Sequence, residues 1–421
     1  DYDNIEAELR SNPLVFDETG VGVAKRAEYL TADDFEEIDF RLNDNDKDIV
    51  LNGKFDIKLS ELSSIAVGGT FVYNNNNDYR RAFSLYNYEN NEQTLVTDYR
   101  VFGRYMQRFE NAEAGDDAKE EDKSLIKNAF FSLQADFSRR NVLTQDRNHE
   151  SDFFKYGYLG KFVANTALSY SDNTFNPVIL ADGNEYRGQF LNAFDAPISY
   201  DYTASDVNPY LANYTSNYYS FFPQGDPRYS TSVQVEGNGG IINGGSVNGN
   251  IYNMWSATGS VNNRYRKTEN DQIRLSGRGS ADIGDHAIIL GFEYEQRVDR
   301  LYQLDPRDLW DLGRLSINSH ILQIDSSNYS VSYTDPVNPI DATVTFERRY
   351  GGDDQRSYFA YNMRRALGLD PSGIDFIDFD SYDIDLYNMS YFSADQLINP
   401  ANNIDLIYRG YDYKGKKLNS A

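Results

Sequence analysis

The residues from Asn43 to Asp48 could bind a metal ion. Asp44, Asp46 and Asp48 place carboxylate oxygens at alternate positions, and oxygen atoms are the ligands that Ca²⁺ prefers. The run lacks the central glycine and the distal glutamate of an EF-hand loop. A solvated loop is therefore the favoured interpretation, and a calcium site is the alternative.

A second acidic run lies between residues 375 and 385 and is interleaved with aromatic residues. It comprises Asp375, Asp378, Asp380, Asp383 and Asp385, separated by Phe376, Phe379 and Tyr382. The acids could chelate a divalent cation, or they could turn outward from a packed loop whose interior holds the aromatic rings. The packed loop is the favoured interpretation.

Two clusters of tyrosine could contact a ligand or a partner protein. They comprise Tyr214, Tyr218 and Tyr219, beside Phe221 and Phe222, and then Tyr408, Tyr411 and Tyr413. Exposed aromatic rings can stack on sugars or on peptide side chains. Tyrosine also gathers where a β-barrel meets lipid headgroups, so the position in the fold decides. A structural role is favoured.

The composition excludes several other kinds of site. Cysteine is absent and the three histidines lie far apart in sequence, so zinc sites built on these residues are not expected. The net charge of −25 argues against nucleic acid, whose binding needs clustered Lys and Arg. No Ser-His-Asp arrangement, nucleotide-binding loop or paired-carboxylate motif stands out. We therefore predict neither an enzyme nor a cofactor, apart from the possible calcium ion.

The segment from Gln272 to Arg297 shows which elements position the charged residues. Apolar and polar residues alternate up to Ile283 and again from Ile288, and Gly284-Asp285 between them predicts a hairpin with a type II′ turn. Ile283 then faces His286. Counting back from this pair places Arg274 opposite Glu295, Leu275 opposite Tyr294 and Gly279 opposite Leu290.

This register puts the apolar residues on one face of the hairpin and many charges on the other. The charged face is unsuited to a dry interior, because unpaired buried charge is costly. A transmembrane β-barrel satisfies both faces, with apolar side chains toward lipid and polar ones toward a wet lumen. An ordinary antiparallel sheet on a soluble core is the alternative. In a barrel the following side chains would face the lumen or contact a plug: Arg100, Arg104, Arg108, Arg274, Arg278, Glu293 and Glu295.

Further alternating runs strengthen the barrel interpretation. They lie at 48–59, 65–73, 97–109, 125–137 and 156–168, with weaker candidates at 228–236 and at 251–265, which contains Trp255. If Leu59 pairs with Ile65, Gly53 faces Phe71 and Phe55 faces Gly69, so an aromatic ring would cover each glycine. The whole is predicted to be all-β, a partial antiparallel barrel of about eight strands. No apolar run among the 421 residues approaches the roughly 20 that a membrane helix needs.

The remaining segments are predicted to be loops with small elements. Residues 1–43 are polar and acidic, and 171–250 are so long that a strand at 228–236 is suspected within them. We expect barrel strands and their loops over 1–300 and one very long extracellular loop region over 301–421. In the latter we predict a strand at 342–348 and two helices. One helix spans about 355–367 and has Asp354 as its N-cap and Gly368 after its end. The other begins at a capping box on Ser393.

Four blocks resemble the large TonB-dependent receptors of the Bacteroidetes outer membrane. They are the segments 251–302, 356–373 (RSYFAYNMRRALGLDPSG), 392–400 (FSADQLINP) and 410–418 (GYDYKGKKL), and the stretches 10–20 (RSNPLVFDETG) and 27–43 (AEYLTADDFEEIDFRLN) are similar as well. The likeness is to the type with an N-terminal carboxypeptidase-regulatory-like domain. It implies a 22-stranded barrel around a plug, importing a scarce nutrient with energy from the inner membrane. The plug and the TonB box would lie outside this chain, which we take to be mature or truncated material.

Three hypotheses follow for the function. The first is transport, as part of a plug-gated outer-membrane receptor that captures a ligand in its extracellular loops. The second is an outer-membrane barrel that acts as a structural or assembly subunit, whose long loops hold partner proteins. The third is a soluble, surface-exposed β-rich binding module. For the first two, the expected partners are outer-membrane lipid, the TonB complex through a region outside this chain, and a surface lipoprotein or another outer-membrane subunit.

Overall fold

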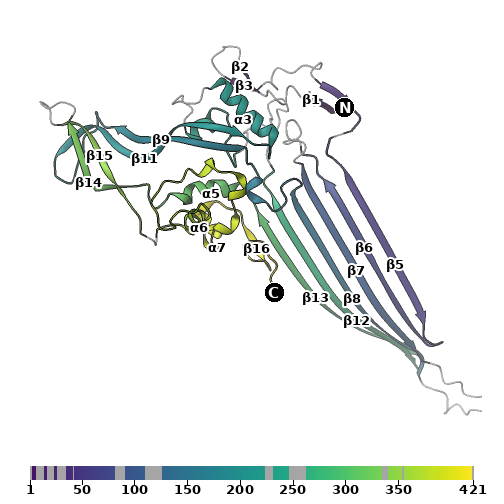
Figure 1. Cartoon of the computed structure of the whole chain (residues 1–421). Coiled ribbons are helices and arrows are strands. Elements are labelled where there is room, and N and C mark those ends of the chain that lie inside the picture. Colours follow the sequence, from purple (N-terminus) through teal and green to yellow (C-terminus); the bar gives the residue numbers. More distant parts are fainter. Residues whose placement is uncertain are drawn as a thin grey trace, which may run out of the picture.

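The computed structural model describes residues 2–5, 14–16, 23–25, 35–40, 42–80, 91–109, 126–222, 231–245, 262–333, 340–352 and 355–419. The fold is mostly β-sheet and has two large parts (Figure 1). One is a long antiparallel sheet, and the other consists of two chain excursions that pack together at one end of this sheet. The predicted all-β class is thus borne out at the level of the dominant secondary structure. Several short helices accompany the strands.

The long sheet, hereafter the main sheet, has seven strands in the order β16-β13-β12-β8-β7-β6-β5. They are β5 (Asp46–Lys58), β6 (Ser63–Asn77), β7 (Glu92–Arg108), β8 (Ile126–Asp146), β12 (Tyr265–Ile283), β13 (His286–Leu304) and β16 (Ile407–Arg409). All neighbours are antiparallel. The predicted hairpin register is confirmed, since Ile283 pairs with His286 and Arg274 with Glu295.

The register between β5 and β6 differs from the prediction by two residues. Ile57 pairs with Ile65, so Gly53 faces Gly69 and not Phe71. The turn is shorter than expected because the Ser60 hydroxyl accepts the N–H groups of Leu62 and Ser63 and tightens it.

Aromatic rings do cover glycines in this sheet, but at other pairs than predicted. Phe102 lies over Gly68 on one face, and Phe292 lies over Gly277 on the other. A Cβ atom at either glycine would overlap the ring of its partner. The aromatic side chain thus fills the gap that the missing side chain leaves.

Connections at the two ends of the main sheet differ in length. The β5–β6 turn and the Gly284-Asp285 turn lie at one end, whereas the excursions 147–264 and 305–406 both leave from the other end (Figure 1). We call this second end the upper end. The run at 156–168 was predicted as a barrel strand, but β8 pairs directly with β12. No additional strand is therefore needed to bring the chain back.

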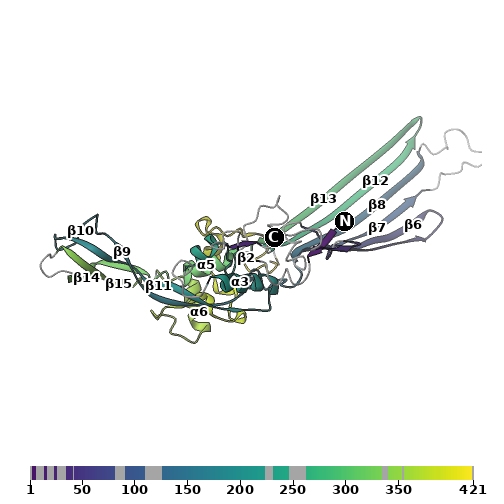
Figure 2. The same cartoon turned by 90° about the horizontal axis from the view of Figure 1, so that it is seen from above.

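Five further strands form a second sheet, which projects from the rest of the structure as an arm. They are β9 (Gly160–Asp172), β10 (Val178–Ile179), β11 (Glu185–Ala204), β14 (Gln323–Tyr333) and β15 (Asp341–Arg349). β11 pairs antiparallel with β9 and parallel with β15, so the arm joins both excursions. Figures 1 and 2 show it pointing away from the main sheet. The strand predicted at 342–348 is confirmed as β15.

The helices lie between the arm and the main sheet. They are α3 (Pro209–Phe221), α4 (Ser232–Gly237), α5 (Asp308–Ile317), α6 (Tyr358–Ala366) and α7 (Ala394–Ile398), with short 3₁₀ turns η5 (Phe153–Lys155), η7 (Phe379–Ser381), η8 (Ile384–Leu386), η9 (Met389–Tyr391) and η10 (Pro400–Asn402). Around α5, α6 and α7 an aromatic core forms what we call the helical body. A smaller core lies under α3 and α4.

Two helix predictions hold and one strand prediction is wrong. The capping box on Ser393 starts α7, and Gly368 follows α6 with a positive φ of 70°. The N-cap of α6 is Ser357, whose hydroxyl accepts the N–H of Ala360; Asp354 lies outside the described residues. The strand predicted at 228–236 is helix α4, which starts with a capping box at Thr231. The strand candidate around Trp255 falls almost wholly outside the described residues.

The loop predicted over 1–43 contains short strands. β1 (Tyr2–Ile5) pairs with β4 (Phe35–Ile38), and β2 (Leu14–Phe16) pairs with β3 (Val23–Lys25). Leu14 is buried beside α3, and its N–H donates to Asn217. Strands of three or four residues are too short to show an alternation in sequence, which explains the wrong prediction.

Candidate functional site

One face of the main sheet is apolar, and none of the described elements forms a second layer over it. Its exposed side chains include Ile49, Leu51, Phe55, Ile57, Val67, Phe71, Val101, Leu133, Ile273, Leu275, Leu290, Phe292 and Tyr294. Leu290 is 73% exposed and Leu275 is 42% exposed, although both lie well inside their strands. Apolar patches of this extent on a protein mark a surface that meets a partner or a membrane.

The upper border of this apolar face runs obliquely across the strands. The last apolar residues before the first polar one are Ile49, Tyr73, Tyr99, Phe137, Ile273 and Tyr294, in the order β5, β6, β7, β8, β12 and β13. Through the register, Tyr294 is level with Phe55, which is six positions below Ile49 on β5 (55 − 49). At a rise of ~3.3 Å per residue and ~4.8 Å between strands, a drop of six positions over five strand steps is an angle of about 40°.

The opposite face of the main sheet is polar and carries all seven charged residues predicted for a lumen. The register places the following on this one face: Arg100, Arg104, Arg108, Arg274, Arg278, Glu293 and Glu295. The side chain at their centre is Asp136 on β8, which is only 7% exposed. It pairs with Arg100, and its second oxygen lies 3.5 Å from Arg274 Nε.

Asp136 was not singled out by the sequence. Glu293 and Glu295 were the acids expected on this face, but the described ion pairs of Arg100 and Arg274 are with Asp136. Gln134 donates to the same carboxylate and completes its hydrogen bonding. The position of Asp136 among the polar residues of β8 was the one feature of the sequence that could have indicated its role. The cross-strand arginine partners were not visible before the registers of β7 and β12 were known.

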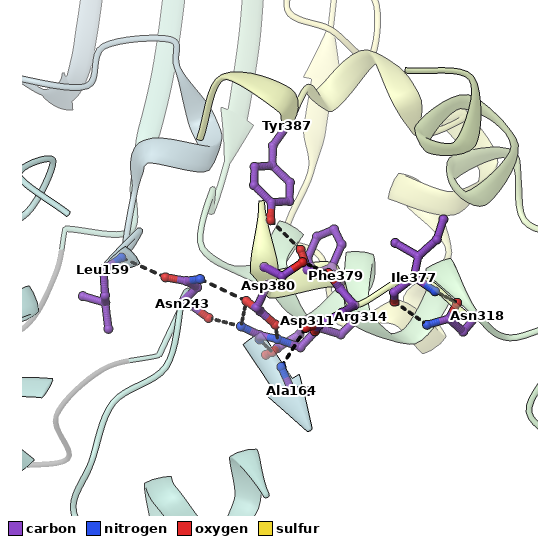
Figure 3. Close-up of polar contacts among 12 residues, drawn as sticks. Leu159, Ala164, Asn243, Asp311, Arg314, Asn318, Ile377, Phe379, Asp380 and Tyr387 are labelled. Atoms are coloured by element: carbon purple, nitrogen blue, oxygen red, sulfur yellow. Dashed lines mark hydrogen bonds and ion pairs between the residues drawn. The ribbon is translucent and has the colours of Figure 1, made fainter. Parts of the chain in front are cut away.

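A buried polar network holds the two excursions together (Figure 3). Arg314 on α5 donates from Nε and Nη2 to Asp380, at 2.7 and 2.9 Å, and from Nη2 to the carbonyl oxygen of Asn243, at 2.5 Å. The Asn243 side chain donates to Asp380 and accepts the N–H of Leu159 at 2.8 Å. We call Asn243, Arg314 and Asp380 the joint, because their contacts connect β9, α5 and η7.

Electrostatics at the joint follow from burial and from its charges. Burial alone would lower the pKa of Arg314, but the Asp380 carboxylate outweighs burial and raises it. Asp378, two residues away, accepts the N–H of Ala164 at 2.7 Å. Burial raises the pKa of Asp378 to about 6, the Ala164 N–H opposes this rise, and the negative charge of Asp380 adds to it. The acidic run at 375–385 is thus part of a packed segment, as the favoured interpretation predicted. Its acids do not all turn outward as that interpretation expected, because Asp378 and Asp380 accept hydrogen bonds inside the segment.

A hollow of about 420 Å³ opens beside the upper end of β12, under η8 and η9. Its lining includes Lys155, Lys267, Lys414, Asp152, Asp385, Ser151, Asn388, Ser390, Phe153, Phe154, Tyr265, Ile384, Tyr387 and Met389. Tyr265 and Lys267 have the same parity on β12 as Ile273. The hollow therefore lies on the same side of the main sheet as the apolar face, above its border.

The predicted ligand-contacting tyrosines lie mainly in the cores. Tyr214 and Tyr218 are 3% and 1% exposed in the core under α3, and Tyr411 is 7% exposed in the helical body. Tyr219 and Tyr408 are partly buried against the same cores. In this structure their rings support packing, which was the favoured structural alternative.

The geometry at the predicted calcium loop does not favour an ion. Asn74 Nδ2 donates to Asp46 at 2.6 Å and to Asp48 at 2.7 Å, so an amide donor lies between the two carboxylates. Within the described part of the chain, no three His, Cys, Asp or Glu side chains form a group that could hold a metal. Calcium binding at Asp44, Asp46 and Asp48 stays a prediction.

Comparisons with known proteins find no relatives. No protein-family model, no curated protein and no solved structure matches this chain. Among the described residues, no helix is both long enough and apolar enough to cross a membrane. The geometry of the main sheet and the residues of the excursions are therefore the basis on which a function can be inferred.

Proposed function

We propose that the main sheet is part of the wall of an outer-membrane β-barrel, in a TonB-dependent receptor that imports a scarce nutrient. The observation that carries the proposal is the uncovered apolar face with its oblique border. In a barrel this face meets acyl chains, and the opposite face, with Arg100, Asp136 and Arg274, lines a wet lumen. The resemblance of segments such as 356–373 to Bacteroidetes receptors adds the transport activity.

The angle of the border supports the membrane assignment. A bilayer surface is flat, so strands that are tilted in a membrane must change from apolar to polar at successively shifted positions. The border of about 40° falls in the tilt range of roughly 35–45° of transmembrane barrels. An apolar face that packed on a protein partner would have no physical reason to end on a straight oblique line at this angle.

The height of the apolar band supports the membrane assignment as well. On β12 the band extends from Ile273 to Ile283, which is about 33 Å along the strand and about 25 Å along the normal at this tilt. The apolar band of outer-membrane barrels is also ~25 Å tall. Four of the six border residues are aromatic, namely Tyr73, Tyr99, Phe137 and Tyr294. Aromatic side chains gather at membrane–water interfaces in this way.

Two adjacent residues of β13 provide a matched test. Leu290 and Ile289 are both apolar, and they are 73% and 57% exposed on opposite faces of the strand. We expect Leu290→Arg to destabilise the barrel by roughly 2–4 kcal/mol and to lower its amount in the outer membrane, because the charge would face lipid. Ile289→Arg should have a much smaller effect, because its side chain would face water. Folding into lipid vesicles over a urea series measures both, and equal effects would refute the membrane assignment.

The alternative of a structural or assembly subunit is favoured by one feature of the arm. Phe175 near its tip is 92% exposed and Ile179 is 71% exposed, and exposed apolar side chains are typical anchors for partner proteins. Deletion of a TonB box in the complete gene separates the two functions. Loss of growth on a limiting nutrient supports transport, whereas unchanged growth with loss of a co-purifying protein supports assembly. Extraction without detergent would leave only the third hypothesis, a soluble binding module.

A further inference from the structure

The hollow beside β12 combines positive charge with aromatic surface. Lys267 Nζ lies 5.3 Å from the centre of the Tyr265 ring and 6.0 Å from that of Tyr302, and it donates a hydrogen bond to the Gly415 carbonyl oxygen at 3.4 Å. Lys414 is exposed and lies over the Tyr413 ring. Among the ion pairs of the described residues, neither lysine has a carboxylate partner. In a chain of net charge −25, two such ammonium groups at one hollow indicate an anionic ligand.

The other polar groups of the hollow are one ion pair, one exposed acid and several uncharged groups. Lys155 pairs with Asp152 at 2.7 Å, and Asp385 is an exposed acid among the lining residues. Ser151, Asn388 and Ser390 add hydroxyl and amide groups, and Tyr265 adds an aromatic ring. Hydroxyl, amide and aromatic groups suit the recognition of a sugar. The volume of about 420 Å³ falls within the range of small-molecule sites.

The position of the hollow relative to the apolar band selects the source of the ligand. Lys267 is six positions above Ile273 on the same side of β12, which is about 20 Å along the strand and about 15 Å along the membrane normal. The headgroup layer of a phospholipid leaflet is only about 5–8 Å thick. A phospholipid phosphate would therefore lie below the hollow, whereas the sugars of a glycolipid extend to its height.

We propose that the hollow binds the anionic sugar headgroup of an outer-leaflet glycolipid whose acyl chains lie against the apolar face. Lys267 and Lys414 contact a phosphate or carboxylate group on the sugar, and the neighbouring hydroxyl and amide groups contact its ring. Between the hollow and the band, Arg139 and Arg300 pair with Asp271, at 2.5 and 2.9 Å, so the intervening surface is polar as well. This inference rests on the membrane orientation of the proposed function.

The test measures glycolipid bound to the intact protein in nanodiscs of phosphatidylethanolamine. The probe is lipid A that carries a phosphorylated core oligosaccharide. We expect the double variant Lys267→Gln and Lys414→Gln to retain about tenfold less glycolipid than the unaltered protein, since each lysine loses its attraction to the anion. The control variant Lys54→Gln and Lys58→Gln removes the same charge from the polar face and should retain it fully. An equal loss in both variants, or a loss in neither, overturns the proposal.

Competition separates the sources of the anion. We expect neither the delipidated oligosaccharide, nor phosphatidylglycerol, nor inorganic phosphate at the same concentration to displace the glycolipid. Displacement by the free oligosaccharide or by phosphate overturns the assignment to a lipid. Displacement by phosphatidylglycerol overturns the conclusion that the hollow lies too high for a phospholipid phosphate. An unchanged unfolding transition of the double variant shows that it folds. The Leu290→Arg experiment tests the membrane orientation separately. A failure of the membrane assignment can therefore be distinguished from a failure of the glycolipid site.

Discussion

The main sheet and the helical body use the same residue types in opposite ways. Phe292 on β13 is 57% exposed, whereas Phe359 on α6 is fully buried and stacks on Phe392 with ring centres 4.1 Å apart. Arginine follows the reverse pattern, since Arg100 lines an open polar face and the Arg314 side chain is mostly enclosed in the joint. The helical body therefore carries its own core, and the main sheet depends on its surroundings to cover its apolar side.

This difference predicts that loss of an aromatic ring destabilises the helical body only when the ring belongs to its core. Phe359→Ala should destabilise the helical body by about 3–5 kcal/mol, because the ring is buried and leaves a cavity. Phe292→Ala should leave the stability of this body unchanged. Trp255→Phe makes Trp310, which is buried in the body, the single tryptophan, and its fluorescence during urea unfolding reports the transition. A similar shift in both variants would mean that the two regions unfold as one unit.

Removal of an enclosed charge should lower the stability of the helical body more than removal of an exposed charge. Arg314→Met leaves Asp380 without its cation in a site where both side chains are less than 20% exposed, and we expect a loss of about 2–4 kcal/mol in the Trp310 transition. Arg278→Met on the polar face is the control and should change it by less than about 0.5 kcal/mol.

A second change at the joint distinguishes charge from packing. The double variant Arg314→Met and Asp380→Leu removes both charges, and it should recover part of the stability that Arg314→Met loses. If the two single losses simply add, the side chains act through packing and the ion pair contributes little.

Local patterns were sufficient to predict much of the main sheet. A two-residue turn fixes the register of β12 and β13, so alternation and Gly284 together gave every pair that was predicted. The Ser60 hydroxyl holds the β5–β6 turn, and the alternation of residue types carries no information about this contact. The register predicted for β5 and β6 was therefore wrong by two positions. At α4 the alternation of Tyr229, Thr231, Val233 and Val235 resembled a strand, although Thr231 and Gln234 already formed the capping-box signature.

The excursions were less predictable because their contacts join distant segments. The polar face followed from parity alone, but the joint brings together residues 243, 314 and 380, which share no local pattern. The hollow likewise needs Lys267 and Lys414, which are 147 positions apart (414 − 267), on one side of β12. Lys414 reaches this place because β16 pairs with β13 at the upper end of the main sheet and the chain turns back between Tyr411 and Lys417.

The smallest expected effect concerns pH and again separates the two regions. Burial raises the pKa of Asp378 to about 6 from its ordinary value of 3.8, so between these values the folded state binds a proton that the unfolded state has lost. Its contribution to stability is therefore full below pH 3.8 and is lost as the pH rises through 6. Asp378→Asn keeps an oxygen that can accept the N–H of Ala164 and removes the charge.

We expect Asp378→Asn to stabilise the helical body at pH 7 and to leave it unchanged at pH 3.5, relative to the unaltered protein. The Trp310 unfolding transition over pH 3.5–7 measures the difference, which isolates Asp378 from other acids such as Asp305, whose pKa is also raised to about 6. The control Asp385→Asn changes an exposed carboxylate and should give no such pH-dependent difference. Destabilisation by Asp378→Asn at pH 7 would mean that the charged carboxylate strengthens its bond to Ala164 by more than its burial costs.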